Sequence, residues 1–244
     1  MTASRRTPLW RQRRILIAAA VTAALAGAAE AGTRIWLENA LDGATASMLG
    51  GQASVGIGAR PALIDLATGS VPTLTVHATG VNVCKVQGAT IDATFQDARR
   101  QNGHLTVASS QASILLPPTA IASLVDARLG TGMTATVIPD PATGRLDVRI
   151  GGLLDLFEQP GLKNGTLTFT PASVGIGGFA APAGLAGGLG SKAAVSQKLP
   201  VLPLAMHAQT VTVTADGLLL GAAGSASGPQ PAKATAPTGG LRSC

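Results

Sequence analysis

The chain has 244 residues, of which only 12% are charged and 2% aromatic, and it contains no tyrosine. Its formal charge of +6 comes largely from residues 1–31, which hold five of the 18 basic residues and one of the 12 acidic ones. The other 13 basic and 11 acidic residues give a charge of only +2. That small charge argues against a nucleic-acid partner, which needs a clustered basic face.

Residues 1–31 are predicted to form a membrane-targeting segment. Five arginines without an acid precede an apolar run from Ile15 to Ala29, which is the order of an export signal. As a helix this run would be roughly 22 Å long, short against a hydrocarbon core of about 30 Å. Ala29-Glu30-Ala31 supplies an A-x-A cleavage site. A cleaved signal peptide and an uncleaved anchor both remain open, and either one places the protein in the cell envelope, outside the cytoplasm.

Two amphipathic helices are predicted after this leader. In residues 33–49, Leu37, Leu41 and Met48 lie on one apolar stripe that Gly50 ends. The second helix is predicted over residues 118–129, with proline at its start and glycine directly after it. A shorter helix is predicted over residues 183–189.

Between the helices, apolar and polar residues alternate with a period of two, which predicts half-buried antiparallel strands. The apolar positions of these strands are Leu74-Val76-Ala78, Ile91-Ala93-Phe95, Leu146-Val148-Ile150, Leu167-Phe169 and Val211-Val213-Ala215. Asn164-Gly165 is the strongest two-residue signal for a hairpin turn. Residues 221–244 are rich in Ala, Gly, Pro and Ser without periodicity and predict a disordered tail.

The sequence contains no recognisable catalytic or metal-binding motif. His77, His104 and His207 are isolated, and phosphate-binding loops, nucleophile elbows and zinc motifs are absent. We therefore predict no catalytic residue, no metal ligand and no cofactor. Scattered acids leave a carbohydrate-active enzyme with paired carboxylates as an unsupported alternative. Whether Cys84 and Cys244 pair is open.

The apolar faces of the strands and helices have two interpretations. They can fill an ordinary core, or a curved sheet can wrap a helix without filling the space and leave an aliphatic groove for acyl chains. Small side chains and few aromatics favour the groove.

Two stretches of the sequence resemble the LmeA-like phospholipid-binding family of bacterial envelope proteins. The first follows the pattern V-x-I-x-x-x-P, a leucine pair, a glycine, a strand and G-V, here at Val55, Ile57, Pro61, Leu63, Leu66, Gly69, residues 74–78, Gly80 and Val81. The second is a closing strand pair, here at Leu199, Pro200, Leu204, Val211, Val213, Gly217 and Leu218. Ala62 stands where the family often has an aromatic residue, and residues 178–196 are unusually rich in glycine.

The resemblance implies a strongly curved antiparallel sheet around a long helix, similar to the tubular lipid-binding proteins. It also implies phospholipid binding outside the inner membrane, linked in the family's best-known member to maturation of envelope lipoglycans. No catalytic residues come with the resemblance.

The predicted protein is an α+β lipid-binding domain over residues 32–220, exported or membrane-anchored, and not an enzyme. Its predicted partners are phospholipid or another acyl-chain lipid and the membrane, while its oligomeric state cannot be derived. A non-catalytic structural or interaction protein of the envelope is the main alternative. The residues predicted to line the acyl-chain groove are Leu37, Leu41, Met48, Val76, Ile91, Phe95, Ile121, Leu124, Leu167, Phe169, Val211 and Val213. Arg60 and Arg128 are the candidate rim residues for a lipid head group.

Overall fold

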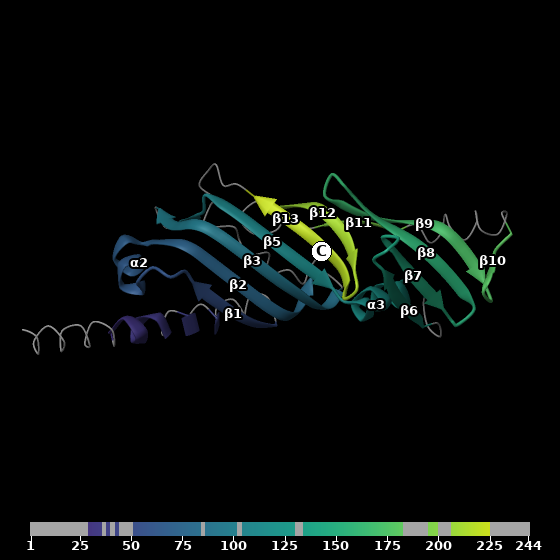
Figure 1. Cartoon of the computed structure of the whole chain (residues 1–244), viewed down its shortest axis with the longest axis horizontal. Coiled ribbons are helices and arrows are strands. Elements are labelled where there is room, and N and C mark those ends of the chain that lie inside the picture. Colours follow the sequence, from purple (N-terminus) through teal and green to yellow (C-terminus); the bar gives the residue numbers. More distant parts are fainter. Residues whose placement is uncertain are drawn as a thin grey trace, which may run out of the picture.

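The computed structural model describes residues 29–35, 38–39, 42–43, 51–83, 86–101, 104–129, 134–182, 195–199 and 206–224. Most of these residues lie in strands, and all strand pairs are antiparallel. The antiparallel β-structure predicted from the alternation is therefore confirmed. The strands form two sheets rather than the single one expected, and Figure 1 shows these sheets one after the other along the molecule.

The larger sheet, sheet A, has seven strands. Six follow the order β1-β2-β3-β5-β13-β12, and β4 pairs with one end of β3. Their bounds are β1 Gln52–Ile57, β2 Ser70–Val83, β3 Val86–Gln101, β4 His104–Thr106, β5 Ser109–Leu116, β12 His207–Thr214 and β13 Gly217–Gly224. Because β13 ends at Gly224, the predicted domain end at residue 220 falls inside a strand. The rest of the predicted tail, residues 225–244, lies outside the described residues.

The smaller sheet, sheet B, has six strands. Five follow the order β10-β9-β8-β7-β6, and β11 pairs with the opposite end of β9 from β10. Their bounds are β6 Ala135–Asp140, β7 Arg145–Ile150, β8 Leu154–Lys163, β9 Thr166–Ile176, β10 Phe179–Ala180 and β11 Val195–Lys198. Asn164 and Gly165, both at positive φ (51° and 69°), turn β8 into β9, so the predicted Asn-Gly hairpin is confirmed.

One hydrophobic core joins the two sheets. It contains Ile91 and Leu220 of sheet A as well as Val148 and Leu156 of sheet B. The helix α3 (Pro118–Leu129) packs against both β3 and β6 and contributes Ile121 to this core. The bounds of α3 are those predicted from the proline at its start and the glycine after its end.

The described N-terminal residues are helical, and they lie along the free edge of β1. Arg34 donates through Nη2 to the carbonyl oxygen of Ile57 (2.6 Å), and Asp42 accepts from the amide of Val55 (2.5 Å). These two side chains occupy backbone groups that β1 would otherwise leave unpaired. Glu30 accepts hydrogen bonds from the amides of Ala62 and Leu63, at the start of the short helix α2 (Ala62–Thr68).

The structure describes only parts of the long amphipathic helix predicted over residues 33–49. Residues 33–35, 38–39 and 42–43 are helical, whereas the remainder of that range, with Leu37, Leu41 and Met48, lies outside the described residues. The same holds for the leader up to residue 28, the helix predicted over 183–189, and both cysteines. Within the described part, no helix has the length and apolar character needed to cross a membrane.

Candidate functional site

The inner face of sheet A carries a row of small side chains beside a row of large ones. Ala93, Ala112, Ala222 and Ala208 lie directly opposite one another on β3, β5, β13 and β12. We call these four residues the alanine row. At a strand spacing of about 4.8 Å the row extends for about 14 Å across the sheet.

The row on one side of the alanine row is bulkier, with Ile91, Ile114, Leu220 and Val211 in register. On the other side, Phe95 of β3 is followed by the small residues Ser110 of β5 and Gly224 of β13. Because a methyl group projects less far than an isobutyl group, the alanine row lies lower than the row that begins at Ile91, and we call this lower strip the trough. Ala93, Ala112 and Ala222 are nevertheless buried, so the trough lies in the interior rather than on the surface.

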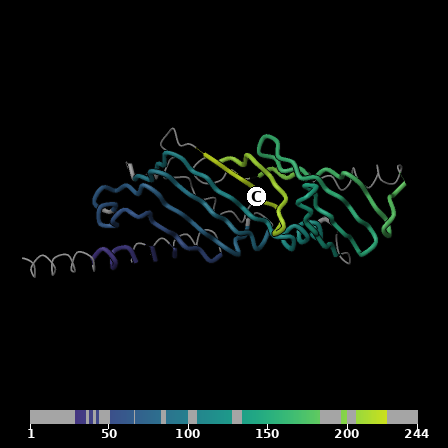
Figure 2. The backbone as a smooth tube through the Cα atoms, viewed as in Figure 1, coloured from purple at the N-terminus to yellow at the C-terminus, as the bar shows by residue number. Residues whose placement is uncertain are grey.

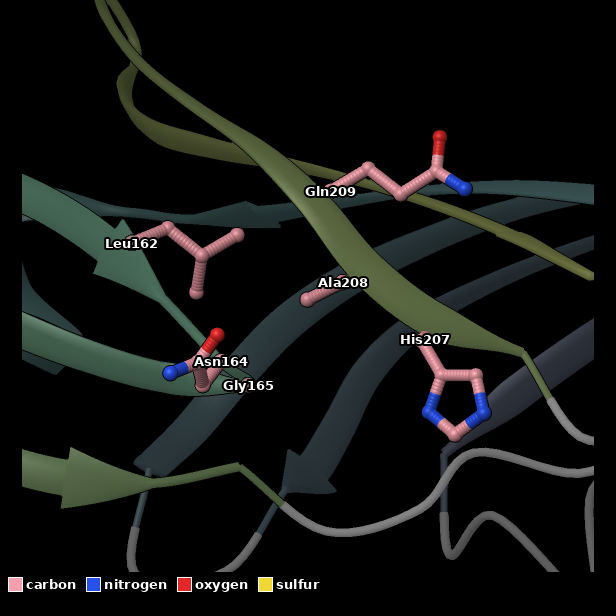
Figure 3. A pocket seen from close by; sticks show the side chains of 6 residues that line it. All are labelled: Leu162, Asn164, Gly165, His207, Ala208 and Gln209. Atoms are coloured by element: carbon pink, nitrogen blue, oxygen red, sulfur yellow. The ribbon is translucent and has the colours of Figure 1, made fainter.

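A pocket of about 380 Å³ lies at the β12 end of the alanine row, where sheet A meets the β8–β9 hairpin of sheet B. It is lined by Leu162, Asn164, Gly165, His207, Ala208 and Gln209. Figure 3 shows Leu162 and Asn164 on one side of the pocket and Ala208 on the other. Its volume is in the range of small-ligand pockets, and three of its six lining residues, Asn164, His207 and Gln209, have polar side chains.

The inner face of sheet B is mostly apolar but carries one buried carboxyl group among its described residues. Glu158 of β8 lies opposite Leu146 of β7, on the same face as Leu156, and is only 5% exposed. Burial raises the pKa of Glu158 from its ordinary value near 4.5 to about 7. Among the described residues, its Oε2 has no hydrogen-bond partner. The inner face of sheet B thus carries a carboxyl group whose burial favours the neutral, protonated form.

The described residues predicted to line a groove all belong to the shared core or pack against it. Val76, Ile91 and Phe95 lie on the inner face of sheet A, and Val211 and Val213 lie on β12. Ile121 and Leu124 come from α3, while Leu167 and Phe169 come from β9. This placement matches the predicted inward orientation.

Several residues of the candidate site were not predicted. The alanine row and the pocket residue Leu162 carry no sequence signal of their own, since pairing between distant strands brings them together. Glu158 could have been found as a charged residue on the apolar side of an alternating strand, because Leu154 and Leu156 precede it at a spacing of two.

The other polar candidates lie away from this interior. His77 pairs through Nδ1 with Oδ1 of Asp92 (2.5 Å) on the outer, exposed face of sheet A. Arg60 forms an ion pair with the buried Asp65 of α2 (Nε to Oδ1, 3.5 Å), and nothing is described for the Arg128 side chain. Among the described residues, no three His, Cys, Asp or Glu side chains gather as metal ligands would.

Comparison with known proteins gives one match. The family model described as LmeA-like phospholipid-binding matches residues 28–223, which includes every strand but the final residue of β13 and both short helices. No match was found among curated proteins or solved structures.

Proposed function

Since the chain belongs to the LmeA-like phospholipid-binding family, we propose that it holds phospholipid by the acyl chains against the inner faces of its two sheets. The observation that carries the proposal is the alanine row, a trough of small side chains that crosses sheet A and ends at the pocket beside Ala208. A strip of small side chains along one bulky row offers space for a long, narrow apolar group such as an acyl chain.

The binding energy in this proposal is mainly hydrophobic. Each methylene removed from water contributes about 0.8 kcal/mol, so a dozen methylenes give on the order of 10 kcal/mol before the cost of ordering the chain. The head group would remain at the pocket, where Asn164, His207 and Gln209 supply polar groups. We therefore propose the pocket, and not Arg60, as the site of the head group, because the guanidinium of Arg60 pairs with Asp65 of α2.

The proposal includes the location of the protein. The basic and apolar residues before Ala29 support export, or anchoring with the domain outside the cytoplasm. There the protein would support the maturation of envelope lipids or lipoglycans. Sequencing the N-terminus of the protein recovered from membrane and soluble fractions of its host tests this part. Recovery of full-length protein from the cytosol alone would refute it.

The binding proposal is tested by filling the trough. In Ala112→Leu, the added side chain occupies the centre of the alanine row, whereas the control Ser113→Leu adds the same bulk on the outer face of the same strand. Native mass spectrometry of the purified full chain is expected to detect co-purified phospholipid in the parent and in Ser113→Leu. In Ala112→Leu the lipid-bound fraction should fall about tenfold.

Overpacking of a core can itself cost about 1–3 kcal/mol, so circular dichroism must show that both variants are folded. Should a folded Ala112→Leu protein keep its lipid, the trough is not the acyl-chain site. If the parent carries no lipid and binds none from vesicles, the proposed function is wrong.

A further inference from the structure

Three large apolar side chains are exposed at one end of sheet B. Leu153 is 68% exposed, Ile176 41% and Phe179 80%. Leu153 lies in the turn between β7 and β8, and the other two residues flank the turn between β9 and β10. Figure 1 places β10 and the adjoining turns at the far end of the molecule, and the green end of the tube in Figure 2 marks the same place. We call Leu153, Ile176 and Phe179 the apolar tip.

The two turns are tied together rather than loose. The amide of Gly177 donates to the carbonyl oxygen of Leu153 (2.7 Å), and Ile176 pairs in register with both Leu154 and Phe179. Each turn contains two consecutive glycines at positive φ, Gly151-Gly152 and Gly177-Gly178, a conformation that other residues rarely adopt. The backbone therefore holds these apolar side chains outward, and little entropy remains to be lost on binding.

The apolar tip is continuous with the inner face of sheet B. Ile150, Leu154 and Ile176 form the last row of that face, in register across β7, β8 and β9. Ile150 is buried and Leu154 packs against the core. An apolar path thus runs from the interior through Leu154 to the exposed side chains.

The size of the apolar tip fits a membrane better than a protein partner. Three side chains of this kind expose roughly 400 Å² together, well below the roughly 800 Å² that each partner contributes to a stable protein interface. A second copy of the chain would therefore find too little area. A bilayer needs only a few apolar side chains to enter its interfacial layer.

The charges beside the apolar tip indicate whether contact with a bilayer depends on anionic head groups or on insertion of apolar side chains. Neither turn contains a charged residue, and Arg149, the described cation that precedes the first turn on β7, is paired with Asp147 (2.9 Å) and Asp155 (3.6 Å). Attraction to anionic head groups would need unpaired basic residues. Contact with a bilayer at this end should therefore depend on apolar insertion and only weakly on salt.

We infer that the apolar tip is a membrane-docking element, which inserts Leu153, Ile176 and Phe179 into the interfacial layer of a phospholipid bilayer. It places the end of the inner face of sheet B at the bilayer surface, where a phospholipid can pass between membrane and protein. This passage rests on the proposed function, but the insertion itself does not.

The experiment uses the full chain with Phe179→Trp, mixed with vesicles of phosphatidylcholine or of its brominated-acyl analogue. Trp10 and Trp36 are present in every variant, so the signal is the emission added over the parent chain. The matched control is Ile138→Trp, because Ile138 is also exposed (43%) on sheet B but lies on β6, outside the apolar tip. The added emission should shift to shorter wavelength and be quenched by brominated lipid for residue 179 and not for residue 138.

A second substitution measures the contribution of the neighbouring side chain. Leu153→Ser in the Phe179→Trp background should lower the ratio of docked to undocked protein about tenfold, as expected for losing one large apolar side chain from a lipid interface. Ile138→Ser in that background should change the ratio less than twofold, and raising the salt from about 0.1 to 1 M should have as little effect.

Unquenched emission from residue 179, or equal quenching at residues 179 and 138, overturns the inference. Failure of the proposed function would look different, because the parent chain would then carry no lipid in native mass spectrometry whatever the quenching shows.

Discussion

Sheets A and B share one core, but they differ in how their edges are covered and in which side chains line their inner faces. The free edge of β1 in sheet A is closed by Arg34 and Asp42, whereas the far end of sheet B exposes the apolar tip. The interior of sheet A carries the alanine row, whereas that of sheet B carries Glu158. Under the two proposals made above, sheet A provides the space for an apolar ligand and sheet B contacts the bilayer.

The first question is whether the two sheets are one folding unit. Leu218 of sheet A and Leu146 of sheet B are both fully buried, at 0% exposure, and belong to the same hydrophobic cluster. Replacing either one with alanine should lower the free energy of unfolding by about 2–5 kcal/mol. Chemical denaturation should show one transition that shifts as a whole in both variants. Two transitions, each sensitive to only one substitution, would divide the molecule into independent domains.

A second test targets the difference between the two interiors. The pKa of Glu158 is raised from about 4.5 to about 7, so the folded protein binds a proton more tightly than the unfolded chain. The resulting stability is fully present below pH 4.5 and is lost as the pH rises through 7. In Glu158→Gln the side chain is neutral throughout, so the variant should be more stable than the parent at pH 8, by about 3 kcal/mol at most.

Near pH 4.5 the parent and Glu158→Gln should differ little. Denaturation curves of both proteins at pH 4.5, 6, 7 and 8 measure the effect. Parallel pH dependence in the two proteins would mean that Glu158 is not the titrating group.

The smallest expected effect concerns the boundary of sheet A. Glu30 accepts from two amides in the first turn of α2, which has proline at its N-cap position and no capping side chain of its own. Glu30→Gln weakens this cap and should cost about 1 kcal/mol. The control Glu38→Gln removes only the ion pair with Arg34, worth about 0.3–0.5 kcal/mol. Thermal unfolding of both variants checks the order of the two effects.

The elements that were predicted from the sequence are those with local signals. The helix α3 has a proline start and a glycine end, and the strands around Val76, Ile91 and Val148 alternate strictly. The helix α2 was missed because its cap comes from Glu30, 32 residues away. The second half of β13 was predicted as part of the disordered tail, because its Leu-Leu-Leu-Gly-Ala-Ala run does not alternate between apolar and polar residues. Pairing with β5 and β12 on either side makes this run a strand.

The candidate site shows the same limit. The inward orientation of Ile91, Phe95 and Leu167 follows from alternation within one strand and agrees with their burial. The alanine row depends on the register of four strands whose alanines lie up to 129 positions apart, from Ala93 to Ala222, and no local pattern contains that register. The single sheet expected from the family resemblance is wrong in number, because the structure has two sheets, which meet at the pocket.

The contact between Glu30 and α2 gives the leader a structural consequence. The predicted cleavage site lies after Ala31, so a cut there would separate Glu30 from the domain whose helix it caps. A product beginning at Gly32 would leave the first amides of α2 to water. Removal of the predicted leader would then also loosen α2, so the local stability of α2 would report whether the residues up to Ala31 are still attached to the domain.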